Sequence, residues 1–150
     1  MMGVQKAIAA AGGIGYIGKG AGSVAAAAYC IIWFFTPLPT IPLLELLALL
    51  LVTAAGVISA HAVEKDWGHD SSRVVIDEVA GMMIALLFVP VQIKYTVTAF
   101  VLFRFFDIVK PLGVRKMEQL PGGWGVMADD VLAGLYAQLL MQLLIAVKLF

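Results

Sequence analysis

The chain has 150 residues, of which 62% are hydrophobic and 13% charged, and its mean hydropathy is +0.98. Soluble domains carry about twice that share of charged residues, so the composition excludes an ordinary soluble protein and predicts a membrane protein. Ten basic and ten acidic residues cancel, which argues against nucleic acid as a partner, because such proteins need a basic surplus.

In chain order, a glycine-rich start is followed by five apolar runs that polar or proline-rich segments separate. Residues 1–20 are typical of a surface or re-entrant segment. The apolar runs cover residues 21–36, 43–60, 74–89, 95–109 and 126–147. A membrane crossing takes roughly 17–25 residues, and the third and fourth runs carry charges, so these two are alternatively buried inside the protein. We predict an all-α fold: one domain over 1–150, a polytopic helical membrane bundle of about five membrane or membrane-buried helices.

The distribution of charge sets the expected orientation. With the N-terminus inside, the inner segments hold seven basic residues and the outer ones two, as the positive-inside rule requires. The seven are Lys6, Lys19, Lys65, Arg73, Lys110, Arg115 and Lys116, and the two are Lys94 and Lys148. All carboxylates except Glu45 then fall on or near the inner face. This concentration is more than solvation requires.

Three short segments carry most of these charges. Asp77-Glu78 begins the third run, Asp129-Asp130 begins the fifth, and Arg104, Asp107 and Lys110 follow one another at intervals of three near the end of the fourth. Intervals of three place side chains on one face of a helix. Acidic residues also occur at helix N-termini simply because the helix dipole favours them. Three segments at the same depth, however, predict a shared polar site, because ionisable groups in membranes are usually paired and functional.

Glycines are expected to bring two of these segments together. Gly81 lies four residues after Asp77, and Gly134 lies four residues after Asp130. Each glycine is therefore one turn from a carboxylate on the same helix face. Small residues let membrane helices approach closely, so the pattern predicts contact between the third and fifth runs.

Clustered carboxylates repel one another, and a divalent cation is the usual remedy. An all-oxygen ligand set suits Mg²⁺ or Mn²⁺. We expect Asp77, Glu78, Asp129 and Asp130 to bind the metal, with Asp107 as an alternative to Glu78. Metal and nearby cations together are what a phosphate-bearing substrate needs.

Two further features allow more than one interpretation. The glycines of residues 122–125 either form an ordinary turn or present backbone N–H groups to an anion. His69-Asp70 is either a polar loop pair, a metal ligand or a general acid–base.

The polar segments resemble the phosphatidylglycerophosphatase A family of bacterial membrane lipid phosphatases. The resemblance rests on AVEKDWGHDSSRVVIDEVAGMMIAL (62–86), on FRFFDIVKPLGVRKMEQLPGGWGVMADDVLAG (103–134) and, more loosely, on GKGAGSVAAA (18–27). The family's usual Pro-Gly-Thr turn is missing, since residues 19–23 read Lys-Gly-Ala-Gly-Ser.

The resemblance implies a Mg²⁺-dependent enzyme that hydrolyses phosphatidylglycerol phosphate to phosphatidylglycerol and phosphate. It further implies a place in the bacterial cytoplasmic (inner) membrane with the active site facing the cytoplasm. The sequence leaves the oligomeric state open between a single unit and a homo-oligomer. The implied catalytic residues are Glu64, Asp70, Asp77, Glu78, Arg104, Asp107 and Lys110. Phosphorus is attacked either by water or by an aspartate nucleophile.

Two other classes remain as alternatives from sequence. One is a CDP-alcohol phosphotransferase, although the Asp-Gly…Ala-Arg spacing of that class is absent. The other is a non-enzymatic ion or metal transporter, which carboxylates at mid-membrane depth would favour. Carboxylates near helix ends favour head-group chemistry instead.

Overall fold

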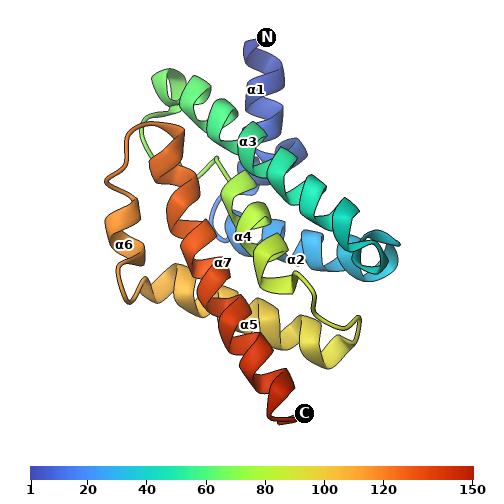
Figure 1. Cartoon of the computed structure of the whole chain (residues 1–150). Coiled ribbons are helices and arrows are strands. Elements are labelled where there is room, and N and C mark those ends of the chain that lie inside the picture. Colours follow the sequence, from blue (N-terminus) through green and yellow to red (C-terminus); the bar gives the residue numbers. More distant parts are fainter.

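The computed structural model describes residues 1–150 and consists of helices without strands (Figure 1). The all-α prediction is therefore confirmed. The α-helices are α1 (Met2–Ala9), α2 (Ala21–Phe35), α3 (Pro42–Trp67), α4 (Ile76–Leu86), α5 (Ile93–Val109), α6 (Val114–Met117) and α7 (Gly123–Ala146), and the 3₁₀ segments are η1 (Ala11–Ile17) and η2 (Leu38–Thr40). Within the first 20 residues, α1 packs against α3 and η1 against α2.

Two helices, α3 and α7, have the length and hydropathy of membrane spans. The end of α3 and the start of α7 lie at the same end of the molecule, so the two helices run in opposite directions (Figure 1). The apolar run predicted to end at residue 60 continues as helix to Trp67, because nothing before Gly68 breaks it. Gly68 ends it with a φ of 85°, a conformation that favours glycine.

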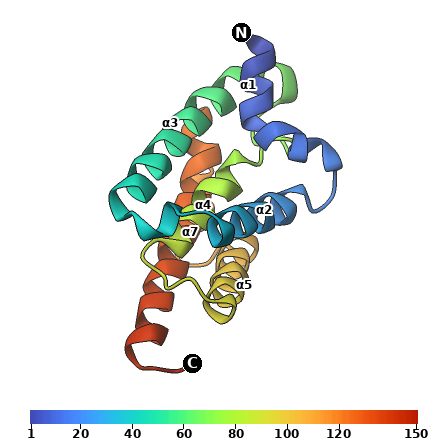
Figure 2. The same cartoon turned by 90° about the vertical axis from the view of Figure 1, so that its right-hand side faces the viewer.

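The helix α4 is central and short. It has 11 residues, of which nine are buried, and it contacts α2, α3, α5 and α7 (Figure 2). Eleven residues rise by about 16 Å, half of what a bilayer crossing needs. The run at 74–89 is apolar because it lies inside the protein, and the expectation of five crossings is not confirmed. The helices α2 and α5, with 15 and 17 residues, are also shorter than a typical span.

Glycines set the distance between α4 and α7. A Cβ atom on Gly134 would lie 3.1 Å from the Cα atom of Gly81 and still closer to its carbonyl oxygen. A Cβ atom on Gly81 would lie 2.7 Å from the carbonyl oxygen of Asp130. The two backbones are therefore in direct contact, as the spacing of glycines and carboxylates predicts.

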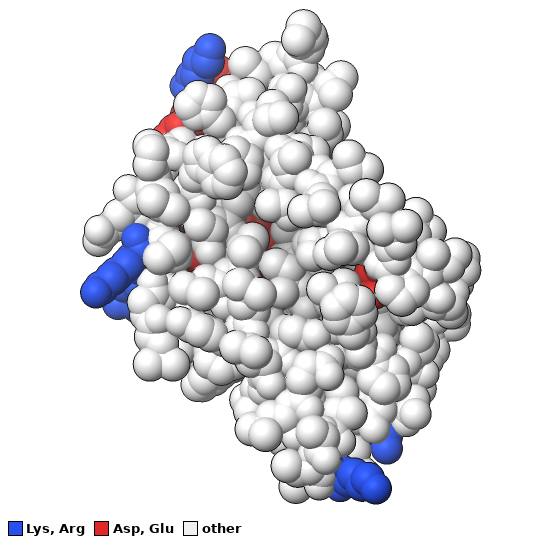
Figure 3. Space-filling view, in the orientation of Figure 1, with Lys and Arg blue, Asp and Glu red and all other residues white.

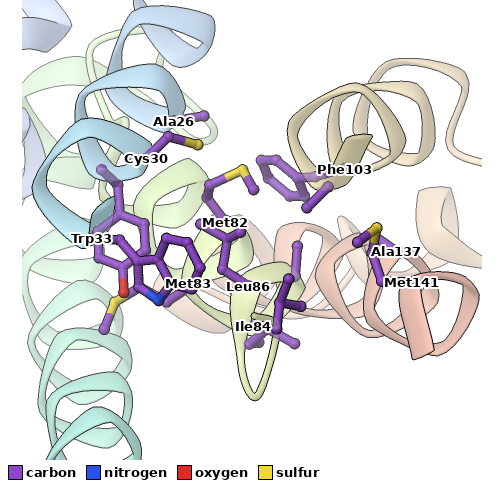
Figure 4. Packing of buried hydrophobic residues seen from close by; sticks show 14 of the residues in the cluster. Ala26, Cys30, Trp33, Met82, Met83, Ile84, Leu86, Phe103, Ala137 and Met141 are labelled. Carbon is purple, nitrogen blue, oxygen red and sulfur yellow. The ribbon is translucent and has the colours of Figure 1, made fainter. Parts of the chain in front are cut away.

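Around this contact, large side chains of α2, α4, α5 and α7 fill most of the core, and Leu49 of α3 and Val114 of α6 complete it. Figure 4 shows Met82 of α4 between Cys30 of α2 and Phe103 of α5, with Met141 of α7 on the far side of α4. The Phe103 ring also lies against Gly81. The side chains that fix α4 in place therefore fix its first turn, which carries Asp77 and Glu78.

The outer surface is mainly apolar. Large exposed side chains line the two long helices, for example Leu50 and Leu51 on α3 and Leu139 and Leu143 on α7. Figure 3 shows one face of the molecule with basic side chains only at its edges and a few acidic atoms in its middle. A surface of this kind is suited to lipid rather than water.

One carboxylate, Glu45, is buried away from all the others. It is 1% exposed near the start of α3 and accepts a hydrogen bond of 2.8 Å from the indole Nε1–H of Trp33 in α2. We expect Glu45→Leu to lower the free energy of unfolding by about 1–3 kcal/mol, because it leaves a buried donor without an acceptor. Glu45→Gln keeps an acceptor and should cost less. Thermal unfolding in detergent compares the two variants, and equal losses would show that the hydrogen bond is not what matters.

Candidate active site

Five carboxylates from three helices form one cluster, the carboxylate cluster, whose members are Asp77, Glu78, Asp107, Asp129 and Asp130. One ligand oxygen from each of Asp77, Asp129 and Asp130 lies within 4.8 Å of the others, and the same holds for Glu78, Asp107 and Asp130. Asp130 belongs to both groups of three. The cluster thus joins the first turn of α4, the end of α5 and the second turn of α7.

Four carboxylate oxygens of the cluster are free to bind a ligand. Asp77 Oδ1, Glu78 Oε2, Asp129 Oδ1 and Asp130 Oδ2 are buried and have no hydrogen-bond partner in the protein. Burial, and then the charges of Glu78 and Asp130, raise the pKa of Asp77 in α4 well above its usual value. Burial likewise raises the pKa of Glu78. Buried, unpaired acceptors are costly unless a cation satisfies them.

The donor set fits Mg²⁺. Every ligand available in the cluster is a carboxylate oxygen, which hard divalent cations prefer. The four metal ligands expected from sequence, Asp77, Glu78, Asp129 and Asp130, are all present, and Asp107 lies with them. Cys30 belongs to the hydrophobic core instead, so no sulfur ligand is offered.

Two basic residues border the cluster. Arg104 pairs with Asp107 one turn further along α5. Lys110 follows α5 with a φ of 52°, and its ammonium group binds both Glu118 and Asp129, the latter at 2.6 Å. Burial alone would lower the pKa of Lys110, but the hydrogen bonds to Asp129 and Glu118 raise it. Lys110 therefore stays protonated and supplies a fixed positive charge.

Sequence reasoning missed the role of Glu118. It lies eight residues after Lys110, beyond a turn at Gly113 with a φ of 89°. No helical or strand period links the two positions. Only the path of the loop brings the Glu118 carboxylate to Lys110.

Glu64 and Asp70, both expected at the site, lie outside the cluster. Glu64 is half-buried on α3, and its Oε1 lies 2.6 Å from Nδ1 of His69. Asp70 is exposed in the following loop and forms no ion pair with a basic residue. His69 reaches toward the cluster through Nε2, which lies 3.5 Å from the carbonyl oxygen of Glu118. The structure thus places a His–Glu pair, rather than single carboxylates, at this edge.

This pair predicts a pH dependence of stability. The hydrogen bond to Glu64, and then that to the Glu118 carbonyl, raise the pKa of His69. A raised pKa stabilises the folded state below the ordinary histidine pKa of about 6.5, and this stabilisation is lost as pH rises through the raised value. His69→Gln should therefore lower Tm more at about pH 5.5 than at about pH 8.5. An equal loss at both pH values would exclude a protonated His69 in the pair.

The glycines near residue 122 serve packing. Gly123 and Gly125 are buried inside the first turn of α7. A Cβ atom on Gly123 would lie 3.0 Å from the backbone nitrogen of His61 in α3. The Gly125 N–H is bonded to the Gly122 carbonyl and is not free for an anion. Gly123 brings α7 against α3, whereas Gly125 packs against the carbonyl oxygens of Glu118 and Leu120 in the loop before α7. Because its N–H is already bonded, the anion-binding interpretation is wrong for Gly125.

A polar cavity of about 500 Å³ opens beside the cluster. Its lining comes from the N-terminal glycine segment, the loop after α3, α4 and α5: Gly18, Lys19, Gly20, Ala21, Gly22, Ser72, Glu78 and Arg104. Gly22 touches the Glu78 carboxylate so closely that a Cβ atom there would overlap it. The segment that departs from the Pro-Gly-Thr pattern thus reaches the site through its glycines.

Comparison with known proteins identifies the family. The family model of phosphatidylglycerophosphatase A matches residues 7–145. The chain belongs to the phosphatidylglycerophosphatase A family. A phosphatidylglycerophosphatase A of Escherichia coli is 34% identical over 116 residues, which cover 75% of this chain and 65% of the relative. One of Haemophilus influenzae is 46% identical over 71 residues, or 46% of this chain and 44% of the relative.

Another relative carries a different name. A Bacteroides thetaiotaomicron protein described as a putative phosphatidylinositol-3-phosphatase is 48% identical over 136 residues, which cover 86% of each chain. No solved structure matches the chain significantly. Membership of the phosphatidylglycerophosphatase A family makes the protein a phosphoric monoester hydrolase, which favours phosphatase chemistry over the CDP-alcohol and transporter alternatives.

Proposed function

We propose that the protein removes the terminal phosphate of phosphatidylglycerol phosphate, a step of phospholipid biosynthesis, and that Mg²⁺ in the carboxylate cluster is required. The observation that carries the proposal is the pair of three-carboxylate groups sharing Asp130. In this proposal the end of the molecule where α3 ends and α7 begins faces the cytoplasm of a bacterial inner membrane. The positive-inside distribution of lysine and arginine supports that orientation.

Some residues of the site stabilise the charge of the phosphate, and another transfers a proton. Bound Mg²⁺ would supply Lewis-acid stabilisation of charge on the phosphoryl oxygens. Arg104 and Lys110 hold positive charge at the edges of the cluster and are placed to neutralise the rest of the phosphate. Their carboxylate partners, Asp107 and Asp129, fix these basic groups in position.

A carboxylate of the cluster orients the attacking water and accepts its proton. Glu78 suits this role because its Oε2 has no partner and the residue lines the polar cavity. The proton then passes to the oxygen of the departing lipid alcohol, so the products are the dephosphorylated lipid and inorganic phosphate.

The name of the Bacteroides relative supports a second candidate head group. In both phosphatidylinositol 3-phosphate and phosphatidylglycerol phosphate, a phosphodiester joins the lipid to an alcohol, and that alcohol carries a phosphomonoester. A metal ion held by the carboxylate cluster, together with Arg104 and Lys110, would bind the monoester in either case. The alcohol between the two phosphates differs. The relative's 48% identity over 86% of this chain justifies testing both lipids.

The test is release of phosphate by purified protein in detergent, with Mg²⁺ or with EDTA, from each of the two lipids. We expect Mg²⁺-dependent release from phosphatidylglycerol phosphate that is lost in Asp129→Asn and kept in Asp66→Asn. Asp66 is a matched control, because it is a half-exposed carboxylate paired with Lys6 at 2.6 Å outside the cluster. Release from phosphatidylinositol 3-phosphate alone would move the proposal to that substrate. Release in EDTA would exclude the metal requirement.

A further inference from the structure

The polar cavity is built to receive an anion. Lys19 lines it and forms no ion pair with any carboxylate. The Nε atom of Arg104, whose side chain also lines the cavity, is buried and has no hydrogen-bond partner. An unpaired buried guanidinium donor is costly unless a ligand satisfies it. The one carboxylate in the wall, Glu78, is the general base of the proposed function.

The start of α2 adds backbone donors to the same cavity. Gly20 precedes the helix with a φ of 84°. The N–H groups of Ala21 and Val24 bond to the carbonyls of Gly18 and Gly20, whereas those of Gly22 and Ser23 have no backbone acceptor. No side chain caps this helix end. Free N–H groups and the helix dipole favour a phosphate there.

An apolar groove lies between α2 and α5. Two adjoining hollows of about 250 and 240 Å³ make up this α2–α5 groove. They share Cys30, Ile31, Thr96 and Val97, and extend to Ala27, Phe34 and Phe35 on α2 and to Ile93 and Phe100 on α5. Arg104 follows Phe100 by four residues, so the face of α5 that lines the groove leads, one turn later, into the polar cavity. Figure 2 shows the two helices side by side.

We propose that one glycerophospholipid occupies both spaces, with its phosphodiester in the polar cavity and an acyl chain in the α2–α5 groove. This inference rests on the proposed function, since it places the terminal phosphate of the same lipid on the carboxylate cluster. Glu78 and Arg104 stand in the wall between cavity and cluster, so the two phosphates of one head group lie on either side of them.

The dimensions of the groove fit a lipid tail. From Ala27 to Phe35 the helix α2 rises by about 12 Å, close to half of the roughly 30 Å hydrocarbon thickness of a bilayer. Ile31, Phe35, Ile93 and Val97 are more than half exposed, so the groove is open along its side. A lipid can therefore enter from the membrane without passing through water.

Substrate preference tests the cavity. Phosphatidic acid carries a phosphomonoester but no phosphodiester, so wild type should favour phosphatidylglycerol phosphate over it in kcat/KM. Lys19→Gln should lower kcat/KM for phosphatidylglycerol phosphate by about tenfold, mainly through KM, and leave phosphatidic acid unchanged. Lys65→Gln, a basic residue of α3 that does not line the cavity, is the matched control. Equal effects of Lys19→Gln on both lipids would exclude the phosphodiester site.

Photocrosslinking tests the groove without any catalysis. Wild type in vesicles is exposed to phosphatidylglycerol with a photoreactive acyl chain, and the labelled peptides are mapped. We expect label concentrated on residues 27–35 and 93–100, with several-fold less in Val97→Trp, which fills the groove. Val101→Trp, one turn away and equally exposed (57% against 56%), should keep the label.

The two proposals fail in different ways. Label spread evenly over the apolar surface, including Leu50 and Leu139, would exclude the groove even if phosphate release is normal. Label in the groove from a protein that releases no phosphate would retain the lipid site and exclude the phosphatase function.

Discussion

Asp130→Asn is expected to lower phosphate release from phosphatidylglycerol phosphate on the order of 10²–10³-fold, as loss of a central charge-stabilising group does in other enzymes. Asp130 is 2% exposed and is the residue that both three-carboxylate groups contain. Any cation held by either group loses a ligand when its charge is removed. No other single substitution in the cluster affects both groups.

The same variant separates metal binding from folding. A ligand that binds only the folded protein stabilises it by about 2.7 kcal/mol at 100 times its Kd, so Mg²⁺ should raise the Tm of wild type. Asp130→Asn should keep or raise the Tm without Mg²⁺, because it removes one negative charge from a group of buried carboxylates that repel one another. Mg²⁺ should raise the Tm of the variant much less than that of wild type. Asp66→Asn is again the control. A variant that retains both activity and the Mg²⁺ response would show that Asp130 is not at the centre of the site.

Much of the site was predictable because its residues recur at intervals of three or four in the sequence, which is the spacing of one helix face. Arg104, Asp107 and Lys110 recur every three residues, and the carboxylate–glycine intervals of four place Gly81 and Gly134 on the faces that meet. Helical periodicity then brings Asp77 and Asp130 together, as the structure shows. The positions of Glu118 and Lys19 were not predictable in this way, since turns and a left-handed glycine, rather than a helix face, decide where these side chains lie.

Hydropathy indicated the helices but not which of them cross a membrane. The segment containing Met82 and Leu86 is as apolar as a span, yet it is covered by four other helices. A helix surrounded by protein and a helix surrounded by lipid have the same composition. Conversely, the polar residues after Ala60 remain helical to Trp67, because extending a helix is easier than starting one and α1 packs against α3. Burial is a property of the assembled fold and not of the local sequence.

Gly134→Ala is expected to move the carboxylates of α4 away from those of α7. Its Cβ atom would lie 3.1 Å from the Cα atom of Gly81 and even closer to that residue's carbonyl oxygen, so α4 and α7 must move apart. Overpacking of this kind costs about 1–3 kcal/mol, and a displacement of about 1 Å can cost roughly 10²-fold in rate. We therefore expect a lower Tm together with a loss of activity greater than that loss of stability explains.

Gly3→Ala is the matched control, because Gly3 lies in α1 and a Cβ atom there meets nothing within 4 Å. The measurement pairs thermal unfolding in detergent with phosphate release at a temperature where the variant is fully folded. A folded Gly134→Ala with normal activity would mean that the α4–α7 distance does not set the carboxylate geometry. A folded variant with low activity and a weakened Mg²⁺ response would show that backbone contact at the glycines holds Asp77 and Asp130 at the separation a shared cation requires.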